Sequence, residues 1–203
     1  MATLDIDTPH GRARVTLEPV ESPRAALVLG HGAGGGVTAR DLVAAAEAAG
    51  AEGFTVALVE QPYRVAGRRS PPPAQHLDAT WTAVVGHLAG GALEGLPLAV
   101  GGRSAGARVA CRTAAATGAV GVLCLAFPLQ PPQGKRPTAP PSRLAELDGV
   151  SVPTLVVQGA RDPFGVPPAA RQRAVVQVDG DHSLRTDSPA VAAAVRAWLA
   201  EIL

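Results

Sequence analysis

Short apolar runs alternate with helical patterns along the chain, and this alternation constrains the fold more than any other feature. Each run is continuous and rich in Val, Leu and Ala, as a strand buried on both faces requires. The predicted buried strands are residues 25–29, 54–59, 98–102, 120–127, 154–159 and 174–178. Strands that alternate with helices predict an α/β fold with a mostly parallel sheet and helices on both of its faces.

The segments between these runs carry helix signals. A helix from Thr38 to Ala49 is expected, with Thr38 as N-cap, Asp41 as its capping-box partner and Gly50 past the end. Residues 105–117 form an Ala-rich helix pattern, and a short helix is expected near 143–147. Another helix is predicted by a stripe of apolar residues at helical spacing: Leu77, Trp81, Val84, Val85 and Leu88.

Both ends of the chain carry local signals as well. Residues 4–6 and 14–17 flank Pro9-His10-Gly11, which predicts an N-terminal antiparallel hairpin. Near the other end, Ser188 as N-cap and Pro189 as the first helical residue predict a closing helix. Its apolar face would hold Val191, Val195, Trp198, Leu199 and Ile202.

Length and composition limit the organisation and the partners. The 203 residues fit one domain, residues 1–203, with the proline-rich stretch 128–150 as an insertion because strands are predicted on both sides of it. A net charge of +1 gives no basic face for nucleic acid. No apolar run approaches the ~18 residues of a membrane span, and the N-terminus carries no apolar signal core. We therefore expect a cytoplasmic protein that binds neither nucleic acid nor membrane.

The two cysteines, Cys111 and Cys124, both fall in apolar runs. Buried thiols are the favoured interpretation, since a small apolar side chain suits such runs. A disulfide between them is the alternative, although no secretory context supports it.

The strongest functional motif is Gly102-Arg103-Ser104-Ala105-Gly106, a G-x-S-x-G between a predicted strand and a predicted helix. A sharp strand-to-helix turn exposes the serine oxygen at the edge of the sheet, and the flanking glycines Gly102 and Gly106 relieve crowding there. A chance motif in a chain with 23 glycines is the alternative. The context favours Ser104 as a nucleophile of an α/β hydrolase.

A glycine-rich loop, His31-Gly32-Ala33-Gly34-Gly35, follows the strand at 25–29. In α/β hydrolases this loop supplies one backbone N–H of the oxyanion hole, and the residue after the nucleophile supplies the other. We expect these to be Ala33 and Ala105, with Gly32 and Gly34 allowing close approach of the backbone. His31 is expected to brace the loop. A phosphate-binding loop is disfavoured because no G-K-[ST] or G-x-G-x-x-G pattern is present.

The other members of a serine triad should follow in the order acid, then histidine. Asp162 follows the strand at 154–159 and His182 follows the last strand, so both should lie at the carboxyl edge of the sheet. Asp179, Asp181 and Asp187 are also near, but Asp179 and Asp181 share the turn that presents the histidine and Asp162 can reach it from outside. The remaining histidines, His10, His76 and His87, precede Asp162.

Several arginines could favour an anionic substrate. Arg103 lies inside the motif, and Arg64, Arg68 and Arg69 lie in one loop, where a solvated surface is the ordinary interpretation. Arg103 and Arg69 are retained as candidates for substrate binding. Lys135-Arg136 in the insertion belong to the same hypothesis.

Six blocks occur together and in order: LGHGAGGG, EQPYRVAGRRSPPP, GGRSAGARVA, FPLQPPQGKRP (with Arg143 after it), VVQGARDPFG and GDHSL. On these the chain resembles the small α/β-hydrolase family typified by testis-expressed protein thirty, which includes a hydrolase-like subunit of the non-specific-lethal complex. It is distantly similar to dienelactone hydrolases, whose nucleophile is cysteine where this chain has Ser104. The resemblance implies the α/β-hydrolase fold and the residues Ser104, Asp162 and His182.

The sequence thus predicts a carboxylesterase- or thioesterase-like serine hydrolase without a large cap domain. Its substrate would be a small-molecule ester or thioester, and the chemistry needs no metal or cofactor. With only 128–150 as a partial cover, the site should be open and shallow. A non-catalytic interaction protein of the same fold and an acyltransferase with the same triad are the alternatives. The oligomeric state is left open.

Overall fold

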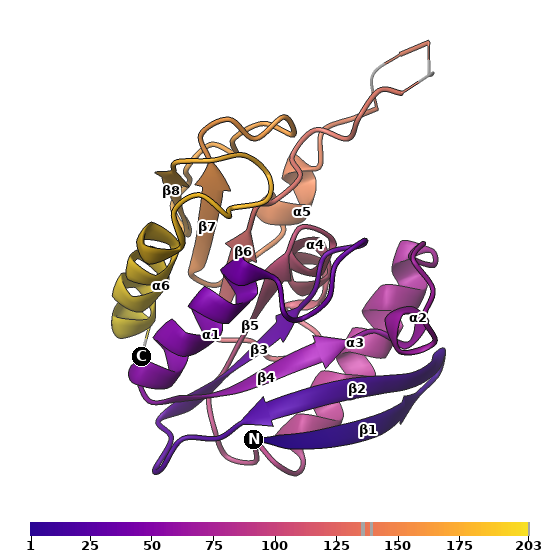
Figure 1. Ribbon diagram of the computed structural model, residues 1–203, viewed down its shortest axis with the longest axis vertical. Helices are drawn as coiled ribbons and strands as arrows, with labels where there is room; N and C mark the ends of the chain where they lie inside the picture. The colour runs from indigo at the N-terminus through magenta and orange to yellow at the C-terminus, as the bar shows by residue number, and fades with distance from the viewer. Residues whose placement is uncertain (135–136, 139, 203) are drawn as a thin grey trace.

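A computed structural model describes residues 1–134, 137–138 and 140–202, and its centre is one eight-stranded sheet (Figure 1). The strand order is β1-β2-β4-β3-β5-β6-β7-β8. The strands are β1 (Ala2–Thr8), β2 (Gly11–Glu18), β3 (Ala25–Gly30), β4 (Phe54–Glu60), β5 (Leu98–Arg103), β6 (Gly121–Leu125), β7 (Thr154–Gly159) and β8 (Arg173–Val178). Each predicted strand is present, with ends shifted by a few residues at most.

The pairing confirms the expected fold class. β1 and β2 form the N-terminal antiparallel hairpin, with Thr8 opposite Gly11 across the Pro9-His10 turn. β2 joins β4 in antiparallel fashion, and every later neighbour pair is parallel. The carboxyl ends of the parallel strands therefore meet along one edge. No large cap domain covers that edge in the part of the chain that the structure describes.

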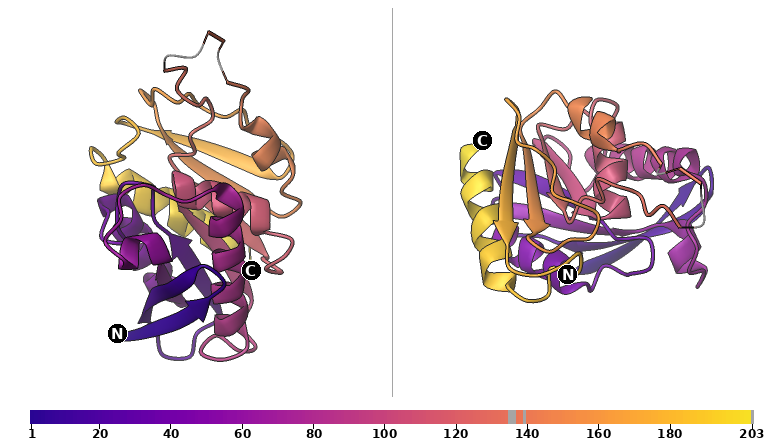
Figure 2. Two further views of the ribbon diagram at one scale, coloured as in Figure 1. Left: turned by 90° about the vertical axis from the view of Figure 1, so that its right-hand side faces the viewer. Right: turned by 90° about the horizontal axis from the view of Figure 1, so that it is seen from above.

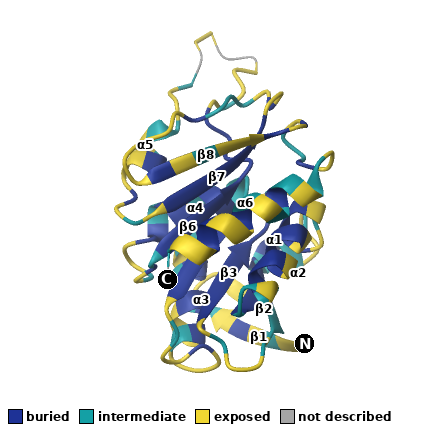
Figure 3. Cartoon of the chain, turned by 90° about the vertical axis from the view of Figure 1, so that its left-hand side faces the viewer, coloured by how far each residue is buried: buried dark blue, intermediate teal, exposed yellow. Residues whose placement is uncertain are grey.

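Helices cover both faces of the sheet (Figures 1 and 2). α1 (Arg40–Ala51) and α6 (Ser188–Glu201) pack against each other on one face. α3 (Ala74–Ala89) and α4 (Ala105–Thr113) pack together on the other. Short helix α2 (Pro62–Val65) packs against β2, and short helix α5 (Leu144–Asp148) packs against α4. Each layer has its own apolar core, and Figure 3 shows the central strands buried between them.

The apolar faces predicted for two helices are the buried ones. Leu77, Trp81, Val84, Val85 and Leu88 of α3 are all buried. On α6 the buried residues are Val191, Val195, Trp198 and Leu199, with Ile202 half-buried at its end.

Several predicted helix ends were wrong. Thr38 does not cap α1, which begins at Arg40 after Ala39, and Asp41 cannot complete a capping box because its buried carboxylate contacts Arg103. α1 also runs through Gly50. The cap of α6 is Asp187, whose side chain accepts the Ala190 N–H, rather than Ser188.

α4 ends at Thr113, four residues earlier than predicted. Beyond this end, the Thr117 hydroxyl donates to the carbonyls of Thr113 and Ala114. Cys111 on α4 and Cys124 on β6 are buried free thiols with Sγ atoms 3.4 Å apart, so the favoured interpretation holds. No helix within residues 1–134, 137–138 and 140–202 could span a membrane.

Candidate active site

Ser104 lies in the turn between β5 and α4 and has a strained backbone, with φ 52° and ψ −105°. A non-glycine residue rarely adopts a positive φ, and such strain is typical of functional sites. The flanking glycines are required by contact. A Cβ on Gly102 would lie 2.5 Å from the carbonyl oxygen of Gly30, and one on Gly106 would be closer still to that oxygen. The turn therefore packs directly on the end of β3.

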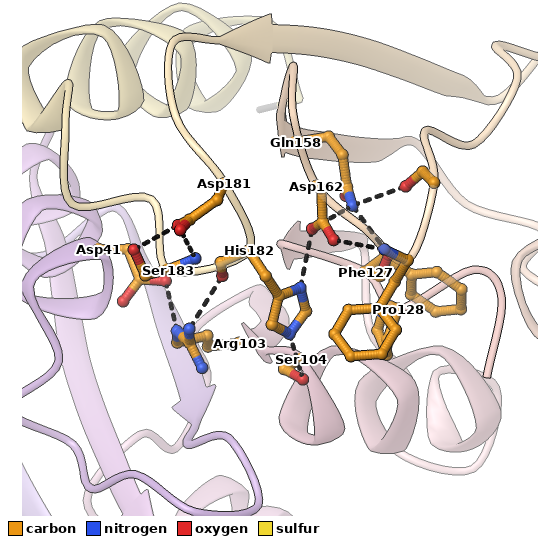
Figure 4. Close-up of polar contacts among 12 residues, drawn as sticks. Asp41, Arg103, Ser104, Phe127, Pro128, Gln158, Asp162, Asp181, His182 and Ser183 are labelled. Carbon is orange, nitrogen blue, oxygen red and sulfur yellow. Dashed lines mark hydrogen bonds and ion pairs between the residues drawn. The ribbon is translucent and has the colours of Figure 1, made fainter. Parts of the chain in front are cut away.

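A chain of hydrogen bonds connects Ser104 to a buried carboxylate (Figure 4). His182 Nε2 lies 2.9 Å from Ser104 Oγ, and His182 Nδ1 lies 2.8 Å from Asp162 Oδ2. Asp162 follows β7 and His182 follows β8, so the parallel strands deliver all three side chains to one edge of the sheet. With the aspartate accepting from Nδ1, the neutral imidazole has its free lone pair on Nε2, toward the serine.

The other three aspartates near the histidine have different partners. Asp179 pairs with Arg161 at the surface. Asp181 accepts from the backbone N–H and hydroxyl of Ser183. Asp187 caps α6. Only the carboxylate of Asp162 contacts the imidazole among the described aspartates.

Gln158, which was not among the predicted site residues, holds the carboxylate of Asp162 in place. Its side chain is fully buried in β7, and Nε2 lies 2.8 Å from Asp162 Oδ2 and 3.0 Å from the carbonyl oxygen of Phe127. The backbone N–H of Phe164 donates to the other carboxylate oxygen at 2.8 Å. A polar residue in an otherwise apolar buried strand was the available signal.

Two further contacts fix the imidazole and its loop. The ring of Phe164 packs edge-on against His182, with centroids 4.5 Å apart. Arg103 donates from Nη2 to the backbone oxygen of His182, and its Nε pairs with Asp41 Oδ2 at 2.8 Å. Arg103 thus connects the loop that carries His182 to α1.

The imidazole of His31 contacts the glycine loop and the backbone of Gln61. The ring is buried, and Nε2 accepts the Gln61 N–H at 3.0 Å. Nδ1 therefore carries the proton and donates to the carbonyl oxygen of Gly32 at 2.8 Å. Burial lowers the pKa of His31 below its ordinary value of 6.5, so the ring is held neutral. His31 does not contact Ser104.

This neutral histidine predicts a pH effect on stability. Unfolding exposes His31, which then binds a proton below pH ~6.5, whereas the folded protein resists that proton. Stability should therefore be highest above that pH and fall as the pH decreases, by at most about 1.4 kcal/mol per pH unit for one proton. Urea midpoints from pH 8 to 5 should fall less steeply for His31→Asn than for wild type. His87→Asn, at an exposed position, should keep the wild-type slope; equal slopes for all three proteins would contradict the assignment.

A cavity of about 340 Å³ opens beside Ser104. It is lined by Ala33, Pro71, Pro72, Ala74, Leu77, Ser104, Ala105, Arg108, Arg112, Pro128, Pro132, Arg143 and Phe164. The two residues expected to form the oxyanion hole, Ala33 and Ala105, thus border the same space as the serine. Arg69 is exposed and is not part of this lining.

The two loop glycines differ in what surrounds them. A Cβ on Gly32 would lie 2.8 Å from Nη1 of Arg103, whereas a Cβ on Gly34 would meet open space.

Lys135-Arg136 lie outside the described residues. No group of three His, Cys, Asp or Glu side chains suited to a metal ion occurs in the described part of the chain.

Comparison with known structures finds the same fold over the whole chain. A serine hydrolase without a lid from Xanthomonas campestris, XC6422, has a TM-score of 0.76 at 20% identity, covering 100% of this chain and 94% of that one. Est1E from Butyrivibrio proteoclasticus has a TM-score of 0.81 at 17% identity, with 100% and 99% covered. Mouse α/β hydrolase domain-containing protein 10 has a TM-score of 0.70 at 12% identity, with 100% of both chains covered.

At these identities the structural matches establish the fold. No curated protein matches the sequence. The family model for the alpha/beta hydrolase domain matches residues 23–194, which include the strand-to-helix turn, Asp162 and His182. The chain therefore belongs to the α/β hydrolase domain family.

Proposed function

We propose that the protein is a serine hydrolase that cleaves a carboxylic ester or thioester of modest size. The observation that supports this most strongly is the hydrogen-bonded chain from Ser104 through His182 to Asp162, with its serine on the wall of a cavity. We further propose that residues 1–203 form one domain that acts without a metal or cofactor.

In the proposed reaction Ser104 Oγ attacks the acyl carbon while His182 Nε2 takes its proton. His182 then gives the same proton to the departing alcohol or thiol. The acyl group remains bonded to Ser104 as an acyl-enzyme. Asp162 holds the imidazole in the required tautomer and stabilises its charge. The N–H groups of Ala33 and Ala105 bind the oxyanion. Water, deprotonated by His182, releases the acyl group and restores the serine.

The fold neighbours support the general class. XC6422 is a serine hydrolase, and Est1E has been crystallised with ferulic acid bound. The finer resemblance to the family of testis-expressed protein thirty remains part of this proposal. A non-catalytic role in protein assembly and an acyltransferase activity are the alternatives, and assays with ester substrates distinguish them.

The direct test is a panel of p-nitrophenyl esters of graded acyl length, measured beside acyl-CoA thioesters. We expect saturable hydrolysis of short members, with a decline once the acyl chain outgrows the cavity. Release of p-nitrophenol or CoA that accelerates with added alcohol or thiol acceptors, and yields the acylated acceptor, would instead indicate an acyltransferase. Complete inertness toward the panel and toward a serine-directed fluorophosphonate would favour the non-catalytic alternative.

The two histidines of the site should differ in importance. His182→Asn removes the base and should abolish detectable ester hydrolysis, whereas His31→Asn loosens a loop and should retain more kcat/KM. Both variants remove an imidazole, so each serves as the matched control of the other. The reverse ranking would mean that the base and the bracing residue have been exchanged.

A further inference from the structure

One wall of the cavity beside Ser104 is formed by arginines. Arg108 and Arg112 lie on α4, four and eight residues after the serine, so they lie on the same side of the helix at steps of about 6 Å. Arg143 belongs to the 128–150 segment and lines the same cavity. Among the described residues that line it, no side chain is acidic.

Two of these arginines already have carboxylate partners. Arg108 donates to both oxygens of Glu146, at 2.9 and 2.6 Å. Arg112 donates to both oxygens of Asp78, at 2.8 and 2.6 Å, and also contacts Glu146. Both acids lie behind the cavity wall, on α3 and α5. These pairs neutralise Arg108 and Arg112 and fix their side chains.

Arg143 has no such partner. Its Nη1 donates to the carbonyl oxygen of Pro128 at 3.0 Å, and no carboxylate lies within ion-pair distance in the described part of the chain. Its backbone N–H donates to the carbonyl oxygen of Leu129, so the residue is anchored at the base of its segment. Partial burial, followed by the charge of Arg108, lowers the pKa of Arg143. A partly buried, unpaired charge is costly unless an anion meets it.

We infer that Arg143 binds a carboxylate carried by the substrate, in the cavity that Ser104 also lines. This rests on the proposed function of Ser104. The planar guanidinium presents paired N–H donors that match a carboxylate. A volume of about 340 Å³ suits a compact molecule, such as a half-ester of a short dicarboxylic acid. The substrate class is thus an ester or thioester with a second, free carboxylate.

A structural role for Arg143 makes a different prediction. If its only function were to hold the Pro128 carbonyl at the start of the 128–150 segment, substitution would lower turnover of charged and neutral substrates alike. Recognition of a carboxylate instead affects only the charged substrate. The ratio of the two kcat/KM values therefore separates the two roles.

The test compares mono-4-nitrophenyl adipate with its methyl ester, which has the same chain and leaving group but no charge. Wild type should prefer the acid. In Arg143→Gln this preference should fall about ten- to a hundred-fold, the usual loss for a hydrogen bond to a charged group. Arg143→Lys should retain part of it. Arg171→Gln, at an exposed position outside the cavity lining, should keep the wild-type ratio.

The inference is overturned if wild type does not prefer the acid, or if Arg143→Gln slows both substrates equally. If neither ester is hydrolysed, the proposed function has failed and binding becomes the readout. Monomethyl adipate is then titrated into wild type and Arg143→Gln by NMR. Weaker binding to Arg143→Gln would still support the carboxylate site, and equal or undetectable binding to both proteins would reject it.

Discussion

Ser104→Ala is expected to lower the kcat of ester hydrolysis by about 10⁶-fold, the loss found when a triad serine is removed. In the proposed reaction this hydroxyl is the nucleophile, which its strained φ of 52° and its 2.9 Å contact with His182 Nε2 support. No described neighbour offers a second nucleophile bonded to that nitrogen. A fluorophosphonate probe should label wild type and leave Ser104→Ala unlabelled.

Ser151→Ala is a matched control, since Ser151 is exposed in the segment that leads into β7, at the opposite end of that strand from Asp162. It should hydrolyse esters and take the probe like wild type. Thermal unfolding of all three proteins separates a lost nucleophile from a lost fold. Labelling of Ser104→Ala, or a well-folded wild type that resists the probe, would contradict the assignment of the nucleophile.

Much of the fold was predictable because its determinants are local. Continuous apolar runs such as residues 25–29 require cover on both faces, and alternation with helices then leaves few topologies. Strand β7 was predicted to the residue, and the Pro9-His10 hairpin turn was placed correctly. Helix ends were harder, since Asp41 favours a salt bridge with Arg103 over the capping role that local rules give it.

The candidate site also has a part that the sequence predicts and a part that only the structure shows. Ser104, Asp162 and His182 each follow a strand, so the sequence alone could bring them to one edge of the sheet. Gln158 also contacts the Phe127 carbonyl, and Arg143 contacts the Pro128 carbonyl. These partners are distant in the sequence, so only the structure shows the contacts. Arg103 was a candidate for substrate binding because of its place in the motif. In the structure its side chain contacts Asp41 and the His182 carbonyl, and these contacts could not be read from the sequence.

The acid of the proposed triad is the most informative member to test, because three other aspartates lie close to His182 in the sequence. The carboxylate of Asp162 has no exposed surface and accepts from three donors: Gln158 Nε2, the Phe164 N–H and His182 Nδ1. These hydrogen bonds fix the orientation of the carboxylate. Gln158 Nε2 and His182 Nδ1 both donate to Oδ2, and the Phe164 N–H donates to Oδ1. An amide in its place would therefore turn an NH₂ group either toward both side chains or toward the Phe164 N–H, where an acceptor is needed.

Asp162→Asn should therefore lower kcat by about 10⁴-fold, because a donor facing Nδ1 favours the tautomer that presents N–H, and not a lone pair, to the serine. Asp179→Asn and Asp181→Asn should change kcat far less, since those carboxylates contact Arg161 and Ser183. Stopped-flow hydrolysis of p-nitrophenyl esters measures all three variants, and circular dichroism checks their folding. A large loss in Asp179→Asn or Asp181→Asn, with Asp162→Asn near wild type, would move the acid to another residue while leaving Ser104 and His182 in their proposed roles.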